Sequence, residues 1–171
     1  MLPSSIPIPL PGGLNGPLPK FVSVGQQFST DTVDSIDKVV AAEFKKFGNI
    51  DLKGKSVSVG VGSRGIKQQP LVIKALVREL LAVGAEPFII PAMGSHGSGN
   101  ALGQVKVLAS YGITEENMGA PIKATMEVVE LTRLENGTPI FCDKYAMAAD
   151  FIIACNRSNR IQVSVAPTRA V

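Results

Sequence analysis

The sequence predicts an α/β fold, with an open, Rossmann-like and mostly parallel sheet flanked by helices. Short apolar runs alternate along the chain with longer segments of helical periodicity, which is the order that βαβ units produce. Glycine-rich loops directly follow two of the apolar runs, as expected of loops at the carboxyl ends of parallel strands. A chain of 171 residues, 45% of them hydrophobic, is also long and apolar enough to bury one full core.

Strands are predicted where short apolar runs are bounded by turn signals. The segment from Glu135 to Gly137 contains an Asn-Gly turn, so the runs on either side of it are predicted to form a hairpin. The predicted strands are residues 20–26, 56–61, 87–91, 127–131, 140–143 and 151–155.

Helices are predicted where apolar residues recur at helical spacing. The clearest helix begins at Pro70, because a proline suits the first helical turn, and it ends at Gly84. The other predicted helices are residues 33–47, ended by Gly48, residues 101–111, ended by Gly112, a short turn at 114–116 and a brief helix at 146–150.

One folded domain is predicted between two atypical ends. Residues 1–19 hold many prolines and no basic residue, so we expect an extended arm and no secretory signal. Residues 20–157 are predicted to form the α/β domain, and residues 158–171 show no strand or helix pattern. No apolar run reaches the roughly 18 residues of a membrane span. Cys142 and Cys155 lie far apart in apolar segments, so we expect buried thiols in a reduced, cytoplasmic protein.

Charge and histidine content exclude several functions. A net charge of +3, from 17 Lys and Arg against 14 Asp and Glu, is too mild and too scattered to indicate nucleic-acid binding. His96 is the one histidine, so this chain offers no histidine pair for zinc. The sequence also lacks the G-x-x-x-x-G-K-[ST] loop of phosphoryl transfer and the G-x-S-x-G elbow of serine hydrolases. Ser95 adjoins His96 in sequence, where the two side chains would diverge.

The first glycine-rich loop spans residues 60–65 and matches the G-x-G-x-x-G spacing. Its context suits a dinucleotide poorly, because Pro70 places the next helix several residues beyond Gly65 and no acidic residue follows the next strand. Arg64 favours a different ligand, since a guanidinium at a strand end is a bidentate clamp for phosphate or carboxylate. The alternative is a tight glycine turn with a solvated arginine.

The second glycine-rich loop spans residues 94–99 and contains His96, which could take and return a proton near neutral pH. The alternative is a histidine with no role beyond its local structure. Both loops are predicted to leave the same end of neighbouring strands, so His96 and Arg64 would face one crevice. Gln104 could reach that crevice or lie at the surface, and Met93 is interpreted as a packing residue.

Three motifs of this sequence resemble the LarA-type lactate racemase family, whose members carry a nickel pincer nucleotide. The motifs are GVGSRGI at residues 60–66, PAMGSHG at residues 91–97 and ADFIIACNR at residues 149–157. The resemblance extends from about Phe21 to Arg157, with the motifs in the family's order. It implies an N-terminal Rossmann-like domain facing a second α/β domain, with the active site between them.

The resemblance also implies a reaction. In this family a hydride passes from a 2-hydroxy acid to a nickel-carrying pyridinium mononucleotide and returns to either face, while a histidine pair handles the hydroxyl proton. By position, His96 matches the first of these catalytic histidines. Val61, Gly62, Ser63 and Arg64 match the segment that contacts the cofactor. Racemases carry an aspartate where this chain has Val61, so the substrate is expected to be another 2-hydroxy acid or a sugar-derived acid.

After Arg157 the sequence departs from the family pattern. A second histidine, a Ser-Gly-Gly-x-Lys segment with the cofactor-tethering lysine and a metal-binding histidine are expected there, and residues 158–171 contain none of them. We therefore expect a truncated or frameshifted form that binds no nickel cofactor and is inactive alone. A partner chain or a second copy would supply the missing half, docking on an apolar edge. The alternative is a non-catalytic anion- or nucleotide-binding α/β fragment that needs a partner chain.

Overall fold

The computed structural model describes residues 25, 32–48 and 50–156. The elements described below all belong to one compact unit, which begins at Val33. The predicted arm at residues 1–19 and tail at residues 158–171 lie outside the described residues, as does the strand predicted at 20–26 apart from Gly25.

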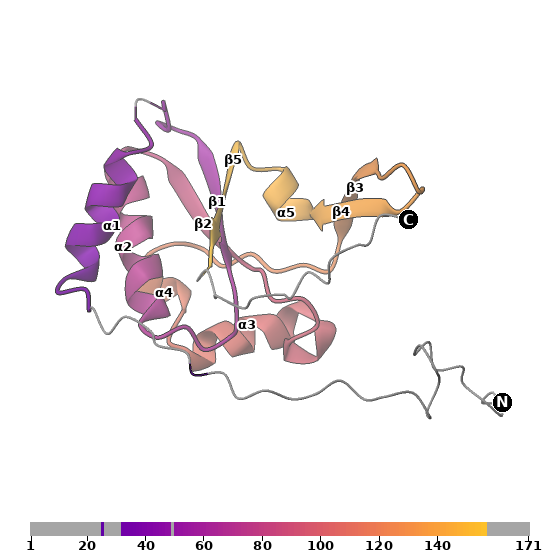
Figure 1. Ribbon diagram of the computed structural model, residues 1–171, viewed down its shortest axis with the longest axis horizontal. Coiled ribbons are helices and arrows are strands. Elements are labelled where there is room, and N and C mark those ends of the chain that lie inside the picture. Colours follow the sequence, from indigo (N-terminus) through magenta and orange to yellow (C-terminus); the bar gives the residue numbers. More distant parts are fainter. Residues whose placement is uncertain (1–24, 26–31, 49, 157–171) are drawn as a thin grey trace. The chain divides into compact units, whose positions relative to one another are not determined.

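A three-stranded parallel sheet forms the centre of the fold, as Figure 1 shows. Its strands are β1 (Ser56–Val61), β2 (Glu86–Pro91) and β5 (Phe151–Cys155), in the order β2-β1-β5. Both neighbours run parallel to β1, with Val59 paired to Ile89 on one side and to Ile153 on the other. The predicted Rossmann-like α/β class is confirmed.

One face of the sheet carries most of the core. Apolar side chains of β1 and β2 on that face pack against the helices that follow them, and the most deeply buried include Val57, Val59, Ile73, Leu80 and Ile89. The helices that contribute to this core are α2 (Gln69–Ala82), α3 (Ala101–Ser110) and α4 (Glu115–Met118). The amphipathic helix α1 (Ile36–Lys45) lies along α2, where the Arg78 guanidinium is 3.0 Å from the Asp37 carboxylate (Figure 1).

The opposite face of the sheet has a much smaller core, formed by Phe88, Ile90 and Ala146. Ala146 belongs to α5 (Lys144–Met147), which follows an antiparallel hairpin of β3 (Val128–Arg133) and β4 (Pro139–Asp143). Apolar side chains of the hairpin remain exposed, as does Ile152 on the edge strand β5. None of the helices in the described part of the chain has both the length and the apolar character that a membrane span requires.

The helix predicted at residues 146–150 begins earlier than the pattern indicated. The Asp143 carboxylate accepts hydrogen bonds from the backbone N–H groups of Tyr145 and Ala146, at 2.8 and 3.0 Å. This cap starts the helix at Lys144, and it ends at Met147. Cys142 and Cys155 are both free thiols, as expected, but they are half-buried rather than fully buried.

A carboxylate fixes the end of the sheet where the three strands begin. Asp150, just before β5, accepts hydrogen bonds from the Ser56 hydroxyl at 2.7 Å and the Ser56 N–H at 2.9 Å, with Lys55 at 3.6 Å. The hydrogen bonds from Ser56, and secondarily the charge of Lys55, hold the pKa of Asp150 below its ordinary value. These contacts set the register of β5 on β1 and leave the other end of the sheet for the site.

Candidate functional site

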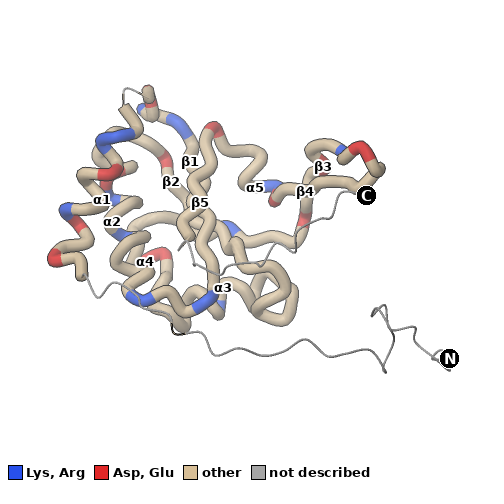
Figure 2. The backbone as a smooth tube through the Cα atoms, viewed as in Figure 1, with Lys and Arg blue, Asp and Glu red and all other residues tan. Residues whose placement is uncertain are grey.

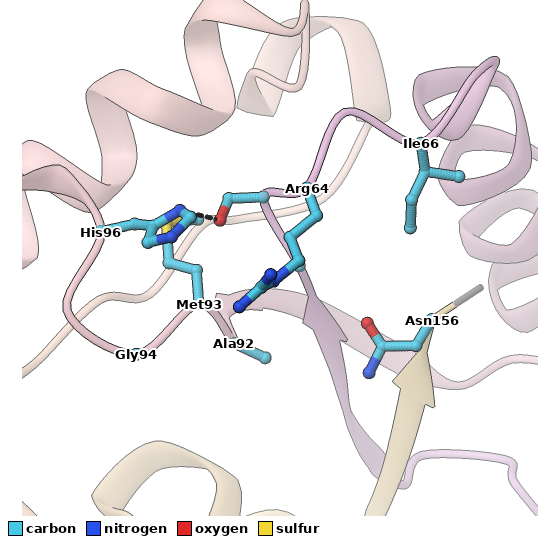
Figure 3. Close-up of a pocket in the computed structure, with 9 residues that line it drawn as sticks. Arg64, Ile66, Ala92, Met93, Gly94, His96 and Asn156 are labelled. Carbon is cyan, nitrogen blue, oxygen red and sulfur yellow. Dashed lines mark hydrogen bonds between the residues drawn. The ribbon is translucent and has the colours of Figure 1, made fainter. Parts of the chain in front are cut away.

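A pocket of about 440 Å³ opens at the carboxyl ends of the three parallel strands. This is where ligands bind in open α/β sheets, and here β1 has β2 as its neighbour on one side and β5 on the other. Figure 3 shows the lining side chains converging from the strand ends. The pocket is lined by Gly62, Ser63, Arg64 and Ile66 after β1, by Ala92, Met93, Gly94 and His96 after β2, and by Asn156 after β5.

The predicted meeting of Arg64 and His96 is confirmed, because both side chains line this pocket. The Arg64 side chain is exposed, and it forms no ion pair or side-chain hydrogen bond within the described part of the chain. In Figure 3 it extends among the lining residues, between His96 and Asn156. A guanidinium at the mouth of a pocket can bind an anion in a bidentate manner.

His96 has a partner that the sequence analysis did not identify. The Ser63 hydroxyl lies 2.6 Å from Nδ1 of the His96 ring, and a dashed line in Figure 3 marks this contact. Ser63 is only 6% exposed, whereas His96 is exposed. Ser95, which adjoins His96 in the sequence, does not form this contact. The serine that contacts the ring comes instead from the loop after β1, which the parallel pairing of β1 and β2 brings alongside.

Side chains from two helices hold the loop after β1. Nε2 of Gln69, a residue only 3% exposed, donates to the Gly62 carbonyl at 3.1 Å. The hydroxyl of Tyr111, at the end of α3, donates to the Ser63 carbonyl at 2.8 Å. Neither residue was identified from the sequence. Helix α2 begins only at Gln69, so the first loop does not run directly into a helix, as predicted.

Backbone contact holds the loop after β2. Gly97 has a φ of +65°, which favours glycine, and it packs directly against the backbone of Gly103 in the first turn of α3. A Cβ built on Gly97 would lie 2.5 Å from the backbone N of Gln104. Gly103 lies in the first turn of a helix, and a glycine at such a position is the sequence signal that could have indicated this close approach.

Gln104 strengthens the second loop. Its side chain is 5% exposed and donates from Nε2 to the Gly94 carbonyl at 2.8 Å. Of the two positions predicted for Gln104, the one at the surface is therefore wrong. The side chain is buried, and its hydrogen bond to Gly94 stabilises the loop that carries His96. Met93 is also buried and belongs to the main core, which confirms its interpretation as a packing residue.

The residues predicted to contact the cofactor differ in where they lie. Gly62, Ser63 and Arg64 line the pocket, whereas the Val61 side chain is fully buried in the main core.

Burial raises the pKa of the Cys155 thiol, on the strand next to Val61, and the thiol therefore stays protonated at neutral pH. Among the described residues, no group of three His, Cys, Asp or Glu side chains lies close enough to hold a metal ion.

Comparisons of the chain with protein-family models, with curated proteins and with solved structures each found no match. The resemblance to the lactate racemase family therefore depends on the three sequence motifs alone. All the lining residues of the pocket come from those motifs: residues 60–66, 91–97 and 149–157.

Proposed function

We propose that this chain carries one half of the active site of a 2-hydroxy acid racemase or epimerase of the nickel-pincer-nucleotide type. The observation that supports this most strongly is the convergence of the three motifs on one pocket, whose lining contains the Arg64 guanidinium and the His96 ring. An anion clamp and a proton-exchanging group are what a 2-hydroxy acid requires, because it has a carboxylate next to its reacting carbon.

The proposed division of labour follows from the chemistry of the two side chains. Arg64 would bind an anionic group, either the substrate carboxylate or a cofactor phosphate, in a bidentate manner. His96 would face the hydroxyl oxygen of the acid and handle its proton, as an imidazole can near neutral pH. Asn156, at the end of β5, offers an amide to a further oxygen atom.

The loop after β1 suits the phosphate of a mononucleotide cofactor. The backbone N–H groups of Ser63, Arg64 and Gly65 donate no hydrogen bond within the described part of the chain, so they are available to an anion together with the Arg64 guanidinium. When bound, such a cofactor would accept a hydride from the substrate carbon and return it. We propose that a partner chain supplies the second histidine and the metal ligands, since His96 is the one histidine of this chain.

The alternative proposal is a non-catalytic protein that binds anions or nucleotides through the same pocket. One observation favours this alternative: among the described residues that line the pocket, Arg64 and His96 are the only ones with ionisable side chains. In either case the free thiols Cys142 and Cys155 support our proposal of a reducing, cytoplasmic location.

The anion clamp is tested by titrating the purified chain with inorganic phosphate and, separately, with a 2-hydroxy acid such as lactate. Binding is followed by calorimetry or by NMR. We expect Arg64→Ala to weaken binding of both ligands at least tenfold, because a charge-assisted bidentate contact is lost. Lys67→Ala is the matched control, since Lys67 is an exposed cation close in sequence but outside the lining of the pocket. Equal weakening by both variants would contradict an Arg64 site.

Catalysis is tested on the tagged chain recovered with whatever polypeptide accompanies it, compared with the chain purified alone. Nickel is measured by mass spectrometry, and interconversion of the enantiomers of a 2-hydroxy acid by chiral chromatography. We expect activity only in the assembly and a loss of at least about 100-fold with His96→Ala. Turnover by the chain alone would overturn the half-site proposal. Anion binding without turnover in any assembly would favour the non-catalytic alternative.

A further inference from the structure

We propose that Ser63 is the positioning residue of His96: its hydroxyl donates to Nδ1, so that the neutral ring carries its proton on Nε2 and presents a donor to the pocket. The distance of 2.6 Å between Oγ and Nδ1 is that of a strong hydrogen bond. Since Nδ1 is occupied by Ser63, Nε2 is the ring nitrogen left for a ligand.

The direction of this hydrogen bond follows from the surroundings of the hydroxyl. Ser63 is 6% exposed, and within the described part of the chain its Oγ contacts no hydrogen-bonding group other than the His96 ring. If Nδ1 carried the proton and donated to Oγ, the hydroxyl hydrogen would need another acceptor in a nearly buried place. Donation from Oγ to Nδ1 satisfies both groups, and buried polar groups are almost always satisfied.

Ser63 is suited to this role because its own backbone is fixed. Its carbonyl accepts from the Tyr111 hydroxyl, and the preceding carbonyl, of Gly62, accepts from Gln69. His96 lies on an exposed glycine-rich loop and has no other side-chain hydrogen bond within the described part of the chain. The hydrogen bond therefore joins an exposed ring to a well-supported point in the loop after β1, and it selects one orientation of the imidazole.

This arrangement has a consequence for the chemistry, which rests on the proposed function. A protonated imidazole carries hydrogen on both nitrogens, so Nε2 carries a proton in the neutral and in the charged ring alike. His96 is thus set up to donate a hydrogen bond from Nε2 to a substrate oxygen. When Nε2 gives a proton to that oxygen or takes one from it, the neutral ring without a proton on Nε2 carries its proton on Nδ1, so the Ser63 hydroxyl must turn and accept from Nδ1–H. Ser63 therefore favours hydrogen-bond donation by His96, and its hydroxyl must turn with each proton transfer, in either direction.

The tautomer can be measured directly, because the chain has a single histidine and its imidazole gives one set of nitrogen signals. The full chain is labelled with ¹⁵N and its long-range ¹H–¹⁵N spectrum is recorded without ligand at roughly pH 9, where an ordinary imidazole is neutral. We expect a protonated-type shift for Nε2 and an unprotonated-type shift for Nδ1. A protonated Nδ1 in the wild-type chain would overturn the proposal.

Variants of Ser63 test whether its hydroxyl positions the His96 ring or only lies near it. Ser63→Ala is expected to move both ring nitrogens toward the values of a free histidine side chain, and Ser63→Thr, which keeps a hydroxyl, to restore the wild-type shifts. Ser95→Ala is the matched control, because Ser95 adjoins His96 but makes no hydrogen bond to its ring. Unchanged shifts in Ser63→Ala would refute the role of Ser63. The measurement uses no substrate, so its failure would leave the proposed function standing, and absence of turnover would leave this inference standing.

Discussion

The loop after β1 and the loop after β2 form the two sides of the pocket, yet different forces hold them. Side chains from α2 and α3 support the first loop through hydrogen bonds to the carbonyls of Gly62 and Ser63. Backbone packing between Gly97 and Gly103 supports the second loop, with one added hydrogen bond from Gln104. Hydrogen bonds can be removed singly at modest cost, whereas close packing of two backbones tolerates no added atom. The anion clamp and the histidine should therefore differ in their sensitivity to mutation.

The largest effect is expected from Gly103→Ala. The new methyl group would collide with the Gly97 carbonyl, which belongs to backbone and cannot move aside cheaply. We expect the free energy of unfolding to fall by about 3 kcal/mol, with displacement of the His96 loop. Thermal or urea unfolding measures the first effect, and the His96 NMR signals report the second.

Gly60→Ala is the matched control for that substitution. A Cβ at Gly60 would meet only the Ala92 Cβ at 3.5 Å and the Ile153 carbonyl at 3.7 Å, which are ordinary contacts. Its stability should stay within about 1 kcal/mol of wild type. If the two variants lost the same stability, the backbone contact between Gly97 and Gly103 would not be what holds the second loop.

Smaller effects are expected from the two glutamines that support the loops. Gln69→Leu leaves the carbonyl of the buried Gly62 without its partner, and we expect a loss of about 2 kcal/mol. Gln104→Leu should cost only about 1 kcal/mol, since Gly94 is exposed and water can replace the lost donor. Urea unfolding of both variants distinguishes the two cases. A larger loss for Gln104→Leu would mean that the second loop also depends on its hydrogen bond.

The smallest effect is expected from Tyr111→Phe. It removes the hydroxyl that donates to the Ser63 carbonyl, but Tyr111 is 37% exposed and solvent can compensate in part. Stability should fall by about 0.5 kcal/mol. Phosphate titration should show a slight weakening, because Ser63 and Arg64 are adjacent on the same loop. Full loss of phosphate binding would assign Tyr111 a direct part in the site.

Sequence patterns identified the elements of the sheet and its main helices because their signals are local. The apolar run at residues 56–61 and the helix after Pro70 were both predicted close to their observed bounds. The hairpin was also predicted, although β3 runs to Arg133 rather than residue 131. The predicted bounds of helix α5 were wrong because they were taken from the apolar residues after position 145. The helix begins earlier, at the residue that follows its cap, Asp143.

The site was only partly predictable from the sequence. Arg64 and His96 were placed in one crevice from topology alone, since parallel neighbouring strands bring their following loops together. The contact between Ser63 and His96 could not be inferred in the same way, because it depends on side-chain directions in two loops 33 positions apart. The supporting roles of Gln69 and Tyr111 were missed for a similar reason. Each side chain donates to a backbone carbonyl, and because every residue has such a carbonyl, no sequence motif indicates which one accepts the hydrogen bond.

The order of strands in the sheet has a consequence for synthesis of the chain. The central strand β1 gains its first neighbour, β2, early, but its hydrogen bonds on the other side await β5, and Ser56 and Asp150 are 94 positions apart. At a translation rate of roughly 5–20 residues per second, this gap corresponds to about 5–20 s on the ribosome. During that time the most buried strand of the finished fold offers an unpaired edge. We therefore expect the nascent chain to be most open to chaperone binding or misassociation before residue 155 emerges.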